Sequence, residues 1–292
     1  MRRCRSYLTI VALICLCACS DTPDPGPADA RYSRIVALAP NLTELVFAAG
    51  AGDTLVGVSA HSDYPPAARE LPIVGDAFTV DQEQLALLQP DLLLAWQSGT
   101  PAHVIDELRD MGHRVETIPT RNLADVATAL RRIGELTGRK EKASIAAGAY
   151  VDRLGSIEQR YAGQEDIRVF YQVSDRPLYT VNAEHYVSEL IHLCGGSNVF
   201  ADLNELAPTV DVEAVVERDP EVMLASTDAG MQAFDEWERW PHLAANRYQN
   251  HFLMPADEIG RATPRLVRAA QAVCDALQVA REKRANAQPV TK

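Results

Sequence analysis

Val80-Asp-Gln-Glu83 followed by Pro90-Asp-Leu-Leu-Leu-Ala95 decides the fold, because the pattern occurs twice in the chain. Val210-Asp-Val-Glu213 followed by Pro220-Glu-Val-Met-Leu-Ala225 repeats its Val, Asp, Glu, Pro and closing Ala at a constant offset of 130 residues, from 80 to 210. Short helix–strand units resemble each other in many α/β proteins, so chance similarity is the alternative. Five coincident positions without a gap favour two diverged copies of one unit.

Around these copies, short β-branched runs alternate with helical stretches, which is typical of α/β layers with parallel strands. We predict an N-terminal α/β lobe at 34–120, a C-terminal lobe at 163–280 and a tail at 281–292. Between the lobes, 122–161 is Ala-rich, with apolar residues at helical spacing, and Gly138 is a candidate interruption. Because so long a helix does not fit inside one lobe, we predict a connecting helix at 121–162.

The N-terminus has the layout of a secretory signal, predicted at 1–18. A basic stretch, Met1 to Arg5, precedes an apolar run, Leu8 to Ala18, that is too short to span a bilayer comfortably. Small residues before Cys19 resemble a bacterial lipobox, which predicts lipidation of that cysteine, although Cys17 is an unusual neighbour. The alternative is ordinary cleavage without a lipid.

Residues 19–33 contain a Pro-rich acidic segment that cannot pack a core and is predicted to be a tether. We therefore expect a periplasmic protein that is held to a membrane only by an N-terminal lipid. The formal net charge of −12 repels phosphate backbones, so nucleic-acid binding is not expected.

Only two of the six cysteines, Cys194 and Cys274, lie outside the signal region. In an oxidising compartment such a pair suggests one disulfide, and two buried free thiols are the alternative.

Catalysis is not expected from this sequence. It contains no Gly-rich phosphate loop, no nucleophile elbow and no His-Glu-x-x-His helix. The seven histidines are scattered without the spacing of metal ligands, so neither a metal site nor a cofactor is predicted.

Aromatic residues follow several predicted strands, at the edge where α/β lobes bind ligands. These candidates, which could stack on a large and partly apolar ligand, are His61, Tyr64, Phe78, Trp96 and Tyr179. Ordinary packing is the alternative for each one. Trp96 has little core to enter, because Gln-Ser-Gly follows it at a strand end.

A charged loop near the C-terminus is a further candidate. It reads Asp257-Glu258-Ile259-Gly260-Arg261, just before a predicted helix. Such a loop can offer backbone N–H groups and a guanidinium to a ligand, or it can simply cap the last helix. By contrast, Trp237 and Trp240 lie in an amphipathic turn and are interpreted as structural.

Several short motifs together resemble those of the periplasmic cobalamin-binding proteins of vitamin B12 ABC importers, which belong to the helical-backbone (class III) substrate-binding proteins. The motifs are Ala39-Pro-Asn-Leu-Thr-Glu-Leu45, Ser62-Asp-Tyr-Pro-Pro66, Pro90-Asp-Leu-Leu-Leu-Ala-Trp96, Cys194-Gly-Gly196 and Thr263-Pro-Arg265. The resemblance runs from about Arg34 to Leu277. It implies two Rossmann-like lobes joined by a long rigid backbone helix, and a disulfide between Cys194 and Cys274.

The resemblance also implies that Glu83 and Glu213, the acidic residues of the repeat, dock on a permease dimer. One carboxylate per lobe suits arginines on two equivalent subunits. The structural alternative is that each Glu only favours a helix N-terminus through the helix dipole.

The resemblance also covers ligand contacts of the family, which match Trp96, Tyr179 and 257–261. It fails at three positions: His61 replaces a Tyr of the family, and Ala77 and Ala207 each replace a Trp. We expect a monomer that binds cobalamin or another corrinoid. The alternatives are a haem or ferric-siderophore carrier, which would need more cleft cations for an anionic siderophore, and an exported enzyme.

Overall fold

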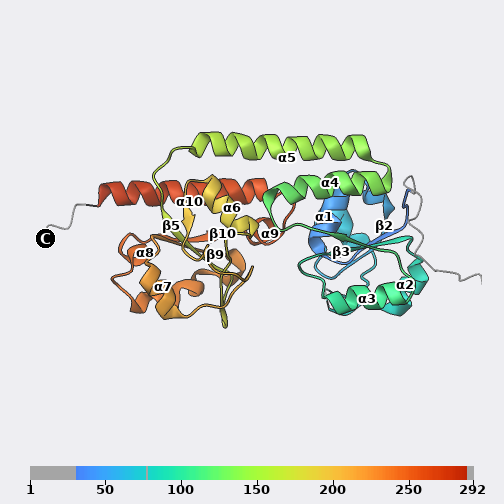
Figure 1. Cartoon of the computed structure of the whole chain (residues 1–292), viewed down its shortest axis with the longest axis horizontal. Coiled ribbons are helices and arrows are strands. Elements are labelled where there is room, and N and C mark those ends of the chain that lie inside the picture. The colour runs from blue at the N-terminus through green and yellow to red at the C-terminus, as the bar shows by residue number, and fades with distance from the viewer. Residues whose placement is uncertain (1–30, 77, 288–292) are drawn as a thin grey trace, which may run out of the picture. The chain divides into compact units, whose positions relative to one another are not determined.

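The structure is a computed structural model that describes residues 31–76 and 78–287. The N-terminal lobe is built on a parallel sheet of order β2-β1-β3-β4 (Figure 1). Its strands are β1 (Ile35–Ala37), β2 (Leu55–Val58), β3 (Leu92–Trp96) and β4 (Val115–Ile118). Its helices are α1 (Pro40–Ala48), α2 (Gln82–Leu88), α3 (Ala102–Asp110) and α4 (Leu123–Thr137).

The C-terminal lobe repeats this plan with a parallel sheet of order β10-β9-β5-β8. Its strands are β5 (Arg168–Gln172), β8 (Ser197–Asn198), β9 (Val222–Ser226) and β10 (His251–Met254), with a small hairpin of β6 (Ser174–Asp175) and β7 (Leu178–Tyr179). Its helices are α6 (Tyr186–Leu193), α7 (Val212–Arg218), α8 (Ala244–Arg247), α9 (Ala256–Ile259) and α10 (Leu266–Asn286). The predicted α/β class with two similar lobes is confirmed.

The internal repeat corresponds to equivalent backbone. Helices α2 and α7 both end on a non-glycine residue in the left-handed region, Gln89 at φ 46° and Asp219 at φ 41°. In each lobe an arginine beside the first strand clamps that turn: Arg34 donates to the Gln89 carbonyl at 3.1 Å, and Arg168 to the Asp219 carbonyl at 2.8 Å. The same helix end and the same arginine contact in both lobes support the view that the lobes arose by duplication of one ancestral unit.

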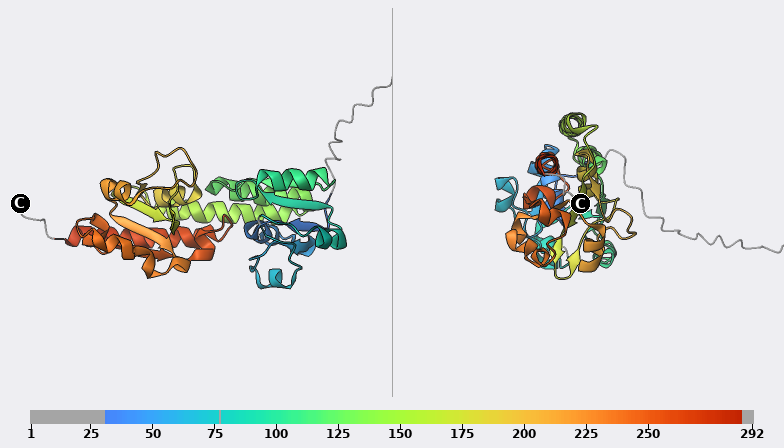
Figure 2. Two further views of the ribbon diagram at one scale, coloured as in Figure 1. Left: turned by 90° about the horizontal axis from the view of Figure 1, so that it is seen from below. Right: turned by 90° about the vertical axis from the view of Figure 1, so that its left-hand side faces the viewer.

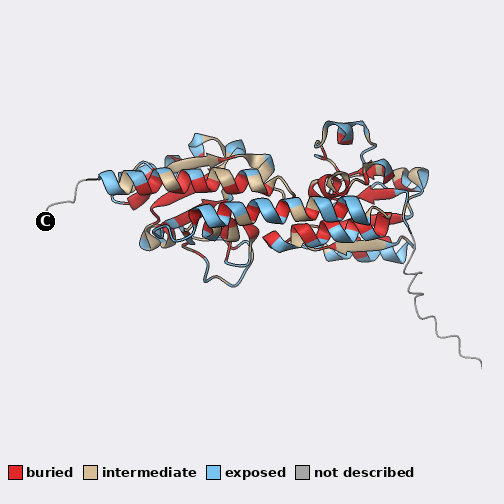
Figure 3. Ribbon diagram, turned by 90° about the horizontal axis from the view of Figure 1, so that it is seen from above, coloured by how far each residue is buried: buried red, intermediate tan, exposed pale blue. Residues whose placement is uncertain are grey.

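The predicted connecting helix is two helices. Gly138, at φ 71°, ends α4, and α5 (Lys140–Tyr161) then runs back as a separate 22-residue helix. The reversal needs a left-handed residue, which glycine adopts without a side-chain clash. Helix α5 packs on α4 and also on α6 and α10, so α5 is the helix that spans the two lobes, and Figures 2 and 3 show it lying along both of them.

A single hydrophobic core continues from one lobe into the other beneath α4 and α5. It includes Leu45 and Leu130 on the N-terminal side, Tyr150 on α5, and Leu190 and Leu277 on the C-terminal side. Burying these side chains together disfavours separation of the lobes, because separation would expose apolar surface to water.

The disulfide that the resemblance implied joins α6 to α10 through Cys194 and Cys274, with Cα atoms 4.8 Å apart. It closes a loop of 80 residues, for which chain entropy gives a stabilisation of about 4 kcal/mol.

Two predicted boundaries differ from the structure. Residues from 281, predicted as a tail, continue α10, and Arg281 donates to the carbonyls of Cys194 and Gly195 at 2.8 Å. The last residues of the predicted tether are also part of the fold, since the Tyr32 amide donates to the Leu136 carbonyl at 2.9 Å. Both extensions are held by hydrogen bonds to distant segments, which composition does not reveal. The predicted signal and Cys19 lie outside the described residues.

No helix within 31–76 or 78–287 is long and apolar enough to span a bilayer.

Candidate functional site

The loop after β2 carries two of the predicted ligand residues and is fixed by buried hydroxyl groups. The Ser62 hydroxyl lies 3.0 Å from that of Thr43 on α1 and 3.3 Å from that of Ser59. This anchor leaves His61, in the left-handed region at φ 64°, and Tyr64 exposed.

A buried carboxylate joins this loop to the segment after β10. Glu44 on α1 is 3% exposed and accepts hydrogen bonds from Arg261 at 3.0 Å and from Arg265 at 2.9 Å. Arg261 also donates to Asp63 at 2.6 Å. The Arg265 guanidinium lies 4.2 Å from the centre of the Tyr64 ring. We call these five residues the Glu44 cluster.

Within the Glu44 cluster, electrostatics favour the charged forms of Asp63 and Arg261. Burial alone would raise the pKa of Asp63, but the hydrogen bond and charge of Arg261 outweigh it and lower that pKa. Burial alone would lower the pKa of Arg261, yet Asp63 and Glu44 raise it. Asp63 and Arg261 therefore form a charged pair between the lobes near neutral pH.

A second connection between the lobes lies at the N-terminus of α4. The Leu123 amide donates to Glu189 on α6 at 2.7 Å, and the Arg121 carbonyl accepts from the Tyr186 amide at 2.9 Å. Burial raises the pKa of Glu189, and nearby Asp125 adds to the rise. Together with the Glu44 cluster, this connection fixes the carboxyl edges of the two sheets at two places.

Trp96 at the end of β3 is half-buried against the shared core, although the sequence suggested that it had little core to enter. Its ring lies across Gly99, where a Cβ atom would come within 1.9 Å of the indole. Because Gly99 has no side chain, the Trp96 indole can lie against its backbone. Phe78, by contrast, is 72% exposed.

On the C-terminal side, a pocket of about 700 Å³ lies at the carboxyl ends of β5 and β9. Gln172 forms part of its wall, held by a hydrogen bond from the buried Trp237 indole at 2.9 Å, which confirms the structural role of that tryptophan. Charged residues at the pocket are Asp175, Arg176, Asp235 and Glu236.

Sequence reasoning did not select this pocket, because its residues come from three separate segments and form no motif. Tyr179 is half-buried in β7, beside the pocket residue Leu178.

The segment 257–261 is only partly accessible. Asp257 is exposed and pairs with Arg261 at 3.2 Å, and Glu258 lies 3.7 Å from Arg265. Ile259 is buried, and its carbonyl accepts from the Tyr186 hydroxyl at 3.0 Å. Gly260 is exposed, and a Cβ atom there would lie 2.9 Å from the Ala256 carbonyl oxygen. The structure thus uses Arg261 chiefly to join the lobes.

The two glutamates of the repeat occupy equivalent places. Glu83 lies in the first turn of α2 and Glu213 in the first turn of α7, and both are exposed. Within the described residues, neither carboxylate forms a hydrogen bond or an ion pair. The Asp81 side chain caps α2 by accepting from the Gln84 amide at 3.0 Å, so Glu83 is not needed as the cap.

No group of three or more His, Cys, Asp or Glu residues suited to hold a metal ion occurs in the part of the chain that the structure describes.

A family model described as periplasmic binding protein matches residues 35–258. The chain is 36% identical over 260 residues to a vitamin B12-binding protein of Vibrio cholerae, covering 89% of this chain and 92% of that protein. The crystal structure of the periplasmic vitamin B12 binding protein of Vibrio cholerae is 35% identical, with a TM-score of 0.79, covering 86% of this chain and 98% of that one. A periplasmic heme-binding protein of Roseiflexus sp. RS-1 shares the fold, with a TM-score of 0.70, 21% identity and coverage of 85% and 99%.

Proposed function

Because the chain belongs to the periplasmic binding protein family, we propose that it captures a cobalamin-type corrinoid and delivers it to an ABC importer. The observation that carries this proposal is the extent of the similarity to vitamin B12-binding proteins, which covers 89% of the chain at 36% identity. The heme-binding structure shares the fold at only 21% identity. The proposed role is binding without catalysis.

The proposed ligand surface combines the exposed aromatic residues of the N-terminal lobe with the pocket at β5 and β9. Flat side chains such as Tyr64 and Phe78 suit the face of a macrocycle, and the charged groups at the pocket suit a rim of amides. The Glu44 cluster would hold the loop after β2 in place, so that its aromatic residues need no reordering when the ligand arrives.

Haem is the second candidate, because His61 presents an exposed imidazole that could reach a metal. An anionic ligand, however, needs free cations. Arg261 and Arg265 already face Glu44, and Arg261 also faces Asp63, so these guanidinium groups are neutralised within the protein. This charge pairing ranks haem and ferric siderophores below a corrinoid.

Calorimetric titration of the purified protein with cyanocobalamin, cobinamide and haem separates the candidates. We expect saturable 1:1 binding of cyanocobalamin and cobinamide, with haem weaker. Binding of haem alone would overturn the corrinoid proposal.

Phe78→Ala tests the aromatic surface with little risk to folding, because the ring is 72% exposed. Loss of one stacking contact of about 0.5–1.5 kcal/mol weakens binding by about twofold to thirteenfold. Ile145→Ala is the matched control, since Ile145 is 66% exposed but lies on α5. Equal affinities for the two variants would remove Phe78 from the site.

We propose further that Glu83 and Glu213 dock on the two subunits of the permease. Their exposure, freedom from partners among the described residues and equivalent places in the two lobes support this role. Replacing both with Arg should abolish cobalamin uptake by cells while leaving cobalamin binding intact.

Glu217→Arg, an exposed change in the last turns of α7, is the control for docking and should leave uptake normal. Normal uptake by the Glu83→Arg, Glu213→Arg double variant would exclude docking and leave the helix-dipole interpretation.

We also propose that Cys19 carries a lipid and that the protein is a monomer in the periplasm. Cys19→Ser should move the protein from the membrane fraction to the soluble fraction. A soluble parent protein would favour simple cleavage of the signal.

A further inference from the structure

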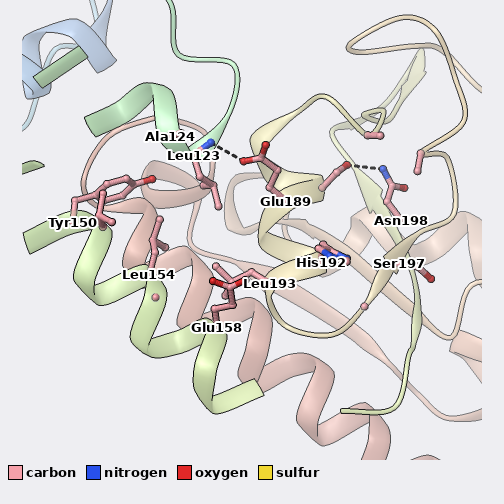
Figure 4. A pocket seen from close by; sticks show the side chains of 16 residues that line it. Leu123, Ala124, Tyr150, Leu154, Glu158, Glu189, His192, Leu193, Ser197 and Asn198 are labelled. Atoms are coloured by element: carbon pink, nitrogen blue, oxygen red, sulfur yellow. Dashed lines mark hydrogen bonds between the residues drawn. The ribbon is translucent and has the colours of Figure 1, made fainter. Parts of the chain in front are cut away.

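A pocket of about 630 Å³ lies where the start of α4, helix α5, helix α6 and the segment after α6 meet (Figure 4). It shares no residue with the ligand surface proposed above. Its walls are largely apolar and include Leu123, Leu154 and Leu193. This size and lining are typical of sites for small molecules.

One polar group in the wall has no partner. The Tyr150 hydroxyl is buried and forms no hydrogen bond with any described residue. Figure 4 shows its phenol pointing toward Leu123 and Glu189. Leaving such a buried group unpaired is unfavourable, and a ligand atom that bonds to it would remove this cost.

Glu189 provides an acceptor beside that hydroxyl. Its Oε2 accepts from the Leu123 amide at 2.7 Å, and no other described residue donates to this carboxylate. The second oxygen therefore has capacity for a ligand donor.

The charge of the lining selects the ligand. Glu158 and Glu189 are its two carboxylates, His192 is its only basic side chain, and no Lys or Arg lines the pocket among the described residues. With a net charge of −12 on the whole chain, anions are repelled and cations attracted. The pocket offers hydrogen-bond acceptors that lack a partner and more carboxylates than basic groups. These features suit an ammonium group.

We propose that this pocket binds a small organic cation, a primary ammonium group on an aryl or alkyl body. The ammonium donates to Glu189 and Tyr150, while the apolar body lies between Leu154 and Leu193. Because Leu123 and Glu189 belong to a connection between the lobes, the bound cation lies at their junction.

Two glycines of α5 make a matched test. Gly155 lines the pocket, Gly148 does not, and a Cβ atom at either would meet nothing within 4 Å. Leucine therefore fits at both places without a backbone clash, and it favours the helix in both variants. Only Gly155→Leu places a side chain in the pocket.

The probe is 2-phenylethylammonium, with 3-phenylpropanoate as its anionic counterpart, measured by isothermal titration calorimetry on the full-length protein. We expect 1:1 binding of the ammonium, at least tenfold weaker binding of the carboxylate, loss of binding in Gly155→Leu and unchanged binding in Gly148→Leu. Glu189→Gln should weaken ammonium binding about tenfold.

Failure of the parent protein to bind 2-phenylethylammonium would overturn the proposal, as would unchanged binding in Gly155→Leu. Equal affinity for the ammonium and the carboxylate would overturn the assignment of a cation.

Discussion

Glu44→Gln tests whether the Glu44 cluster holds the lobes together. The substitution keeps the size of the side chain but removes the charge that faces Arg261 and Arg265. Gln also places an N–H₂ group where an acceptor is needed, so at least one charge-assisted hydrogen bond is lost.

The magnitude follows from what each arginine retains. Removing one partner of a buried ion pair costs about 3–5 kcal/mol, because the other charge stays buried without compensation. Arg261 keeps Asp63 at 2.6 Å, whereas the remaining carboxylate of Arg265, on Glu258, is 3.7 Å away. The uncompensated charge is therefore mainly that of Arg265. We expect a loss of about 3 kcal/mol in the free energy of unfolding, at the lower end of the range.

Guanidinium denaturation at pH 7, followed by circular dichroism with one m-value for all variants, measures the change. Glu236→Gln is the matched control, because Glu236 pairs with Arg239 on the surface, with side chains 49% and 71% exposed. Such a pair contributes about 0.5 kcal/mol. A loss below about 1 kcal/mol for Glu44→Gln, or a loss equal to that of the control, would refute the cluster as a connection between the lobes.

Three further results are expected. Replacing both Cys194 and Cys274 with Ser should lower the unfolding free energy by about 4 kcal/mol in denaturant titrations, and an unchanged midpoint would contradict the closed-loop argument. Asp63 has a lowered pKa in the folded state, so its contribution to stability is present above the unfolded value of about 3.9 and is lost as pH falls through the folded pKa. Asp63→Asn should therefore flatten the dependence of the melting temperature on pH below about 4, and an unchanged slope would exclude this residue as its source. Gly99→Ala should displace the Trp96 indole, shift tryptophan emission and reduce stability by about 1–3 kcal/mol, whereas an unaltered spectrum would show that the ring does not lie across Gly99.

The fold was predictable from the sequence because the patterns that identify its strands and helices span only a few neighbouring residues each. Each strand is a short apolar run beside a helical period, and the offset between Val80 and Val210 identified the second lobe without any knowledge of contacts. The sequence suggested that Gly138 could divide the connecting segment, but it did not determine whether one helix or two would form. A glycine inside a helical pattern can be tolerated or can end the helix, and the choice depends on whether α5 gains more by packing on α4.

The contacts around the candidate site were not predictable in the same way. Glu44 and Arg261 are separated by 217 residues, and a glutamate inside an apolar helix gives no indication of its partner. The position of Trp96 depends on the absence of a side chain at Gly99, a packing effect that no motif records. The pocket at β5 and β9 joins Gln172 to residues near Trp237, and only the tertiary fold brings these segments together.

The two lobes have kept their symmetry selectively, and the proposed function gives a physical reason for the difference. Helices α2 and α7 retain the same first-turn glutamate, the same left-handed end and the same arginine clamp, as the proposed docking on two equivalent subunits would require. The carboxyl edges have diverged: a short turn leads from β3 to α3, whereas the equivalent strand β9 is followed by the long segment that contains Met231–Arg239. A corrinoid has no two-fold axis that would require equal loops. If the proposed function holds, a symmetric partner keeps the two lobes alike where it docks, and an asymmetric ligand allows them to differ where it binds.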